Sequence, residues 1–194
     1  EKLHRANQEE HLGWTCLQKA QYEQAIEHLS TALPIFQEIC DGRGEGRVLG
    51  SLGNAYKFLG QPEQSIELWS KAHAVFREIG NHRGQTTSLL NLGITFSDLC
   101  QHANAVDHLE KYLAICGEFA SRAHEADVFD RLGIAYGGLG ENGRAVEHLS
   151  KAIAIRREID DVSGGGFTLC WLGNVYLNLH QYERCIEHLS VGLP

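Results

Sequence analysis

Apolar residues recur along this chain at helical spacing, in paired runs separated by short polar breaks. Between residues 45 and 79, the first run comprises Val48, Leu49, Leu52, Ala55, Tyr56 and Leu59. The second run comprises Ile66, Trp69, Ala72, Phe76 and Ile79. Steps of three and four residues predict helices with one buried face, so each pair of runs predicts two helices. Between them, Gly60 suits the end of the first helix and Pro62 suits the first turn of the second.

The paired runs repeat every 40 residues without insertion or deletion. The clearest mark is Leu-Gly, at Leu12-Gly13, Leu52-Gly53, Leu92-Gly93, Leu132-Gly133 and Leu172-Gly173. A fixed period in this range predicts one helix-turn-helix unit stacked on copies of itself. We expect a single array over residues 1–194, with repeats near 5–40, 41–80, 81–120, 121–160 and 161–194, the last one truncated. The predicted fold is an all-α, right-handed α-solenoid.

A glycine lies in the middle of each predicted first helix, where it costs about 1 kcal/mol relative to alanine. Its presence at five equivalent places indicates that the two helices of a pair approach closely. Small residues of the second helix would form the other side of this contact, at Ala25, Ser65, Ala105, Ala145 and Cys185.

The motif L-G-x-x-Y followed by G-x-x-x-x-A-I-E-x-L-x-x-A resembles the tetratricopeptide repeat, or TPR, over essentially the whole chain. The usual TPR period is about 34 residues, and the longer repeat here resembles that of the Pins/LGN polarity adaptors and of kinesin light chains. Leu52-Gly53-Asn54 and Leu172-Gly173-Asn174 carry the Leu-Gly-Asn of the Pins/LGN group. The resemblance implies that the first helix of each hairpin lines a concave groove that binds peptides.

Groove positions in TPR families are those six and three residues before the Leu-Gly glycine, and one and four residues after it. Residues two before the glycine lie at the groove edge. The resemblance therefore implies a peptide-binding groove that contains Arg47, Asn54, Lys57, Asn91, Asp127, Arg131 and Asn174. An asparagine amide can both donate to and accept from an extended peptide backbone. Plain solvation of these side chains is the alternative interpretation.

A carboxylate clamp of the chaperone-binding kind is disfavoured. Asn54, Asn91 and Arg131 match three of its five positions, but the two lysine positions hold Gly50 and Asp127. Without those cations, a C-terminal carboxylate would be poorly held.

Charge, apolar content and cysteine positions limit the kinds of partner and the compartment that we expect for this protein. The formal net charge is −8 and the pI is about 5.7, which argues against a nucleic-acid surface because such surfaces cluster Lys and Arg. No apolar run approaches the length of a membrane span. Cys16 and Cys185 stand at packing positions, and free thiols there suggest a reducing, cytoplasmic compartment.

The chain offers no convincing catalytic, metal or cofactor site. His28, His108, His148 and His188 recur at the repeat period, too far apart to share a metal ion, and we expect them to cap the outer side of the second-helix packing. Gly138-Leu139-Gly140-Glu141-Asn142-Gly143 spells G-x-G-x-x-G, but it falls in a turn between helices rather than after a strand. Gly164-Gly165-Gly166 at the start of the fifth repeat is either a flexible joint or sequence drift.

The leading functional hypothesis is therefore a non-enzymatic adaptor or scaffold that binds a protein or peptide segment in its groove. By resemblance to Pins/LGN, the partner would be a polarity or cytoskeletal protein. The alternative is the regulatory or sensor arm of a larger multidomain enzyme or signalling protein. Because the chain lacks methionine and closes within a helical pattern, we expect a fragment of a longer array whose apolar ends could self-associate end to end.

Overall fold

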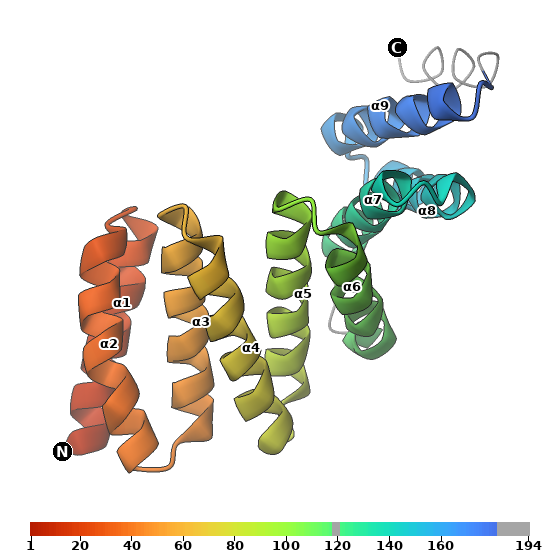
Figure 1. Ribbon diagram of the computed structural model, residues 1–194. Coiled ribbons are helices and arrows are strands. Elements are labelled where there is room, and N and C mark those ends of the chain that lie inside the picture. The colour runs from red at the N-terminus through yellow and green to blue at the C-terminus, as the bar shows by residue number, and fades with distance from the viewer. Residues whose placement is uncertain (118–120, 182–194) are drawn as a thin grey trace. The chain divides into compact units, whose positions relative to one another are not determined.

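The computed structural model describes residues 1–117 and 121–181, and within them every regular element is a helix (Figure 1). The first helices of the hairpins are α1 (Lys2–Gln18), α3 (Gly42–Phe58), α5 (His82–Asp98), α7 (Arg122–Gly138) and α9 (Val162–Asn178). The second helices are α2 (Tyr22–Glu38), α4 (Pro62–Glu78), α6 (His102–Cys116) and α8 (Asn142–Glu158). Equivalent helices begin exactly one repeat apart, so the predicted stack of helix-turn-helix hairpins is confirmed. The expected second helix of the fifth repeat, with Cys185 and His188, lies outside the described residues.

The turn between α3 and α4 has Gly60 and Pro62 where the sequence predicts them, and a positive φ angle follows most of the other helices as well. Pro62 begins α4, while Gly60 and Gly80 adopt positive φ angles of 73° and 65° after α3 and α4. Gly140 has a φ angle of 77° at the corresponding place, but at five other such places the residue is not glycine: Ala20, Cys40, Cys100, Asp160 and His180 all have φ near 55°. The left-handed turn is therefore a property of the repeat, and non-glycine residues accept its strain.

The mid-helix glycines allow the two helices of a hairpin to touch. A Cβ atom at Gly53 would lie 2.7 Å from Cδ1 of Trp69, and one at Gly13 would lie 2.6 Å from Cγ of Leu29. The predicted close approach is confirmed, but the nearest atoms belong to the large residue four positions after the expected small one. At Ala25 it is the backbone carbonyl that comes close, 3.3 Å from the added Cβ.

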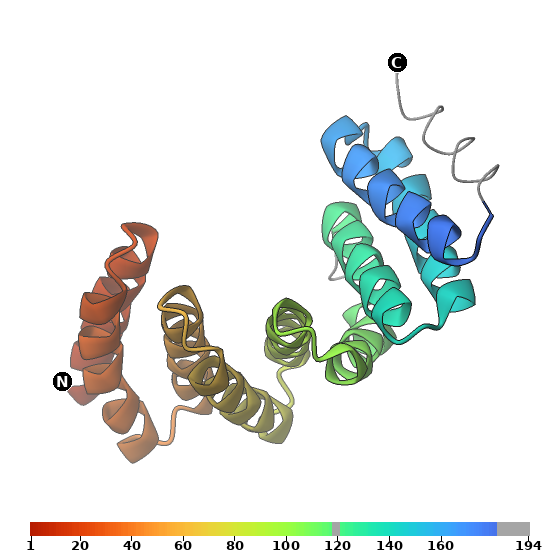
Figure 2. The ribbon, with the colours of Figure 1, turned by 45° about the horizontal axis from the view of Figure 1, so that its top comes forward.

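The chain forms two compact units, residues 1–95 and residues 96 onward, which are described separately. In the first unit, α1 packs on α2 and α3 on α4, and Figure 2 shows each pair side by side. Its core includes the fully buried Leu29, Phe36 and Val48. In the second unit, α7 packs on α8 and α8 on α9, around the fully buried Leu132 and Leu149.

The histidine ladder lies elsewhere than expected. Instead of capping the outer side of the second helices, the half-buried His28, His108 and His148 face the first helix of their own hairpin. Nδ1 of His28 lies 2.8 Å from a carboxylate oxygen of Glu9, and the ring of His148 stacks on that of Tyr136 with centroids 5.3 Å apart. Burial lowers the pKa of His148.

The cysteines occupy mixed environments. Cys116 is buried and the half-buried Cys16 packs against the core, as expected of small apolar residues. Cys40, Cys100 and Cys170 are exposed free thiols. Cys185, the other cysteine expected at a packing position, lies outside the described residues.

Candidate functional site

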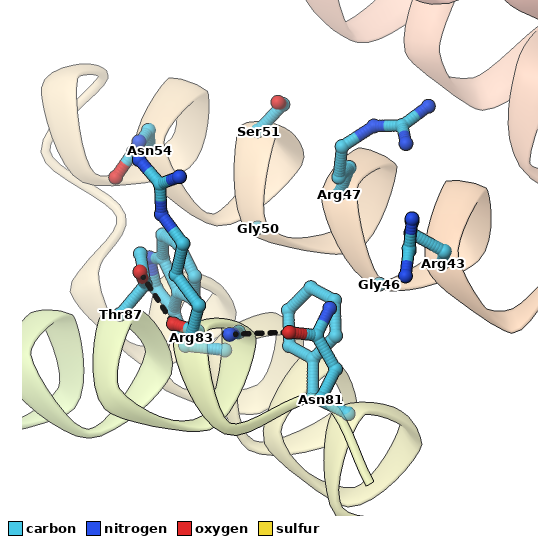
Figure 3. Close-up of a pocket in the computed structure, with 12 residues that line it drawn as sticks. Arg43, Gly46, Arg47, Gly50, Ser51, Asn54, Asn81, Arg83 and Thr87 are labelled. Atoms are coloured by element: carbon cyan, nitrogen blue, oxygen red, sulfur yellow. Dashed lines mark hydrogen bonds between the residues drawn. The ribbon is translucent and has the colours of Figure 1, made fainter. Parts of the chain in front are cut away.

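A cavity of about 550 Å³ opens in the first unit, walled by α3 and α5 and floored by α4 (Figure 3). Its lining residues are Arg43, Gly46, Arg47, Gly50, Ser51, Asn54, Trp69, Phe76, Asn81, Arg83, Gly84 and Thr87. This volume falls in the usual range for ligand sites, about 300–1,000 Å³.

Three glycines bring aromatic rings to the cavity floor. A Cβ at Gly46 would lie 2.5 Å from Cε1 of Phe76, and one at Gly50 would lie 2.7 Å from Cη2 of Trp69. On the opposite wall, a Cβ at Gly84 would overlap the ring of Phe76. Because these positions have no side chain, the two rings fill the space beneath the walls and leave the opening above them.

Arg47 stands at the rim with a partner already bound. Its Nε and Nη2 atoms each donate to a different carboxylate oxygen of Glu10 in α1, both at 2.7 Å. This hydrogen bonding raises the pKa of Arg47, against the opposing effect of burial. The bidentate pair fixes the guanidinium beside the cavity.

Other polar side chains at the rim are available to a ligand. Within the part of the chain that the structure describes, the side chains of Arg43, Arg83, Ser51 and Asn54 make no hydrogen bond or ion pair. Asn81, in contrast, accepts the backbone N–H of Gly84 at 3.0 Å and caps α5. The site thus combines an aromatic floor with unoccupied donors and acceptors.

The structure brings together only some of the groove residues expected from the sequence. Arg47 and Asn54 line the cavity, as do the groove position Thr87 and the edge position Ser51. Lys57 lies one turn further along α3, outside the lining. Asn91, on α5, donates its amide to the carbonyl of Thr87 at 2.9 Å.

The remaining expected groove residues lie in the second unit. Asp127 accepts from Nη2 of Arg156 at 2.7 Å, and Nη1 of Arg131 lies 3.3 Å from Oδ1 of Asp98. Asn174 is exposed on α9. Two of these three side chains are therefore held by charges of their own unit.

Sequence reasoning missed Arg43 and Arg83, which lie in the first turns of α3 and α5. The signal that could have found them is their separation of one repeat. The equivalent residues in the other repeats are uncharged: Leu3, Ala123 and Ser163. Cations thus recur at this position only in the two helices that wall the cavity.

In the second unit, a buried ion cluster replaces the aromatic floor. Arg156 stands at the repeat position of Phe76, and its Nη2 atom lies 2.5 Å from Oδ2 of Asp130. The other oxygen of Asp130 accepts the hydroxyl of Thr168 at 2.7 Å, and Asp161 also pairs with Arg156. Burial raises the pKa of Asp130 against the influence of Thr168 and Arg156. Burial acts to lower the pKa of Arg156, but its carboxylate partners outweigh this and raise it.

Among the described residues, no group of three or more His, Cys, Asp or Glu side chains is placed to hold a metal ion. No helix in the described ranges has the length and apolar character needed to span a membrane.

The hairpins and their glycine-mediated packing define a stacked helical-repeat protein. A tetratricopeptide repeat model matches residues 44–118 and a second one matches residues 126–159. Together the two matches cover more than half of the chain, which belongs to the tetratricopeptide repeat family. No curated protein sequence matches it significantly.

Solved structures share the fold at low sequence identity. The TPR-like repeats of a candidate kinesin light chain from Podosopora anserina are 21% identical with a TM-score of 0.77, over 97% of this chain and 93% of that one. MamA from Desulfovibrio magneticus RS-1 is 17% identical with a TM-score of 0.79, over 97% and 93%. A signal transduction ATPase with numerous domains from Pyrococcus horikoshii, which has a TPR sensor, is 15% identical with a TM-score of 0.81, over 96% of this chain and 30% of that one.

Proposed function

We propose that this protein is a non-enzymatic interaction scaffold that binds a peptide segment of another protein along the first helices of its hairpins. The observation that carries the proposal is the cavity between α3 and α5. It presents the unpaired amide of Asn54 and the rim guanidinium groups above the rings of Trp69 and Phe76. An aromatic floor with a few polar anchors is the usual composition of a binding pocket.

The wider groove belongs to the same proposal. Lys57 and Asn91 would extend the site along α3 and α5, and Asp127, Arg131 and Asn174 would contribute contacts from the second unit. Resemblance to the Pins/LGN group, together with the likeness to kinesin light chain repeats, favours a polarity or cytoskeletal partner in the cytoplasm.

A second candidate is a sensor arm within a larger signalling protein. The likeness to the Pyrococcus horikoshii ATPase favours it, because there the matched segment is 30% of a chain that also carries an ATPase. In that case the segment bound by the cavity would belong to the same polypeptide.

Capture of partners by cavity variants tests the leading proposal. Asn54→Ala with Thr87→Trp removes one anchor and fills the opening, so we expect a partner captured by the wild type to be lost. Gln64→Ala with Ser70→Trp likewise removes one side-chain amide and adds one Trp, but on the exposed surface of α4, and this variant should retain the partner. The captured protein is identified by mass spectrometry, and its binding segment is remade as a synthetic peptide for titration.

The outcomes separate the alternatives. Equal capture by the wild type and the cavity variant would refute binding in the cavity. Capture of no separate protein, with binding only of segments covalently joined to this array, would favour the sensor arm.

A further inference from the structure

The cavity carries a charge opposite to that of the whole chain. The protein has a formal net charge of −8, yet Arg43, Arg47 and Arg83 all line this one opening. No Asp or Glu is among the described side chains that line it. Figure 3 shows the three arginines around the same cavity, two from α3 and one from α5.

The helices gain nothing from two of these cations. Arg43 and Arg83 occupy the first turns of α3 and α5, where the helix dipole disfavours a positive charge. The other repeats have uncharged residues at this position. A helix-stabilising role therefore does not explain why arginines stand on both walls of one cavity.

The three guanidinium groups differ in availability. Arg47 is occupied by Glu10, and the carboxylates that act on it, Glu10 and Asp41, lie outside the cavity lining. Asp41 directs one carboxylate oxygen to the backbone N–H groups of Arg43 and Gly44, as the cap of α3. The side chains of Arg43 and Arg83 are thus left for an anion from outside.

We infer that this cavity selects acidic peptides, a specificity that rests on the function proposed above. Carboxylates of the peptide pair with Arg43 and Arg83, which can each hold a carboxylate in a bidentate manner. An apolar side chain between the carboxylates packs on the rings of Trp69 and Phe76, and Asn54 bonds to the peptide backbone. The ligand class is therefore an extended segment with Asp or Glu on both sides of an apolar residue.

A nucleic acid fits the site less well. Its affinity comes from many phosphate contacts along a basic surface, whereas here the cations are confined to one opening on an acidic chain. The enclosed aromatic floor suits a single apolar side chain.

Peptide libraries of defined charge test the inference. The probe is a fluorescein-labelled set of capped nine-residue peptides, with a central Leu or Phe and two Glu residues at varied spacing. A second set has Gln in place of each Glu. We expect measurable binding of the best Glu peptides by anisotropy, at least about tenfold tighter than that of their Gln counterparts, the size expected of charge-assisted contacts.

Variants of the two arginines test whether Arg43 and Arg83 cause the preference for Glu peptides. Arg43→Gln with Arg83→Gln should remove the preference for Glu peptides, whereas Arg43→Lys with Arg83→Lys should keep part of it because the charge remains. Arg5→Gln with Arg77→Gln makes an equal change in net charge at exposed residues outside the lining and should leave affinity unchanged. Circular dichroism melting checks that each variant is folded.

Each remaining outcome is decisive. Equal binding of Glu and Gln peptides would overturn the acidic preference while leaving peptide binding intact. Binding of neither library would overturn both the preference and the proposed groove function. Tighter binding of a labelled single-stranded oligonucleotide, lost in the Arg43→Gln, Arg83→Gln variant, would reassign the cations to phosphate.

Discussion

The first turn of each first helix accommodates a residue from the end of the preceding second helix. That residue is Phe36, Phe76, Cys116 or Arg156, and eight positions later the chain has Gly44, Gly84, His124 or Gly164. A Cβ at any of these three glycines would overlap the preceding Phe ring or Arg guanidinium. Glycine therefore occurs where the earlier residue is large, and His124 follows the smaller Cys116.

Two glycines of α9 should respond to substitution in opposite directions. Gly164→Ala displaces Arg156 from its three carboxylates, so we expect a loss of about 1–3 kcal/mol in the free energy of unfolding. A Cβ at Gly166 would meet no described atom within 4 Å, and Gly166→Ala should gain about 0.5–1 kcal/mol by stiffening the unfolded chain. Urea denaturation measures both.

Gly166→Ala serves as the control, since both changes add one methyl group to the same helix. Equal effects of the two substitutions would contradict the packing role of Gly164. This result would return Gly164-Gly165-Gly166 to the interpretations of a flexible joint or drift.

At the scale of the helices, the sequence is highly informative because the apolar spacing and the period are exact. Gly60 and Pro62 correctly predict the turn between α3 and α4. The left-handed backbone conformation of Ala20 and Cys40, after the ends of α1 and α2, could not be predicted from the sequence, because neither residue type favours that conformation. Both turns are closed by the same backbone hydrogen bond, which the N–H of Gln21 donates to the carbonyl of Cys16 and the N–H of Asp41 donates to that of Phe36, each at 2.9 Å.

The ion cluster that joins α7, α8 and α9 also escapes sequence reasoning. Asp130 and Asp127 read as groove residues by position, since nothing local reveals that Arg156 approaches them from α8. Both Arg156 and Asp130 are buried, with side-chain exposures of 8% and 4%. A buried pair of this kind is costly to break from one side only.

Arg156→Met should destabilise the second unit by about 3–5 kcal/mol, because Asp130 is left buried without its counter-charge. Asp130→Leu added to Arg156→Met removes the stranded charge, and Leu is the residue at the equivalent position 90. We expect the double variant to regain most of the loss. A double-mutant cycle from urea denaturation followed by circular dichroism gives the coupling, and additive effects would contradict it.

The same variant should acquire a distinctive pH dependence. Burial already raises the folded-state pKa of Asp130, so its ionisation costs stability as the pH rises from the unfolded value near 4 through the folded value. Arg156→Met removes the hydrogen bond and the positive charge of Arg156, both of which lower the pKa of Asp130. The folded-state pKa therefore rises further, and the pH range over which stability is lost extends upward. Stability should therefore fall with rising pH, above the unfolded value near 4, over a wider range than in the wild type. Asp130→Asn with Arg156→Met should abolish the difference, and an unchanged profile would refute the assignment.

At the scale of the whole molecule, the resemblance to TPR families predicts which helix face carries the binding residues. It does not predict where along that face a cavity forms. Arg47 and Asn54 follow from the repeat position alone. The opening depends on Gly46, Gly50 and Gly84 meeting large rings, a combination present at only one described pair of first helices. Asn91 illustrates the limit of position-matching, since its amide is already bound to the carbonyl of Thr87.

Repeat arrays are stabilised by neighbour-to-neighbour contacts, so a local defect should stay local. Each of the two units has its own core, and Arg156 with all its partners lies in the second. We therefore expect Arg156→Met to leave the affinity of the first-unit cavity for the best Glu peptide unchanged within about twofold, at a temperature below the variant's unfolding transition. Gly84→Ala, which strains the cavity floor at Phe76, should weaken that binding under the same conditions. An equal loss of affinity in both variants, while each is folded, would contradict the independence of the two units, and binding in the cavity would then depend on the packing of repeats outside the first unit.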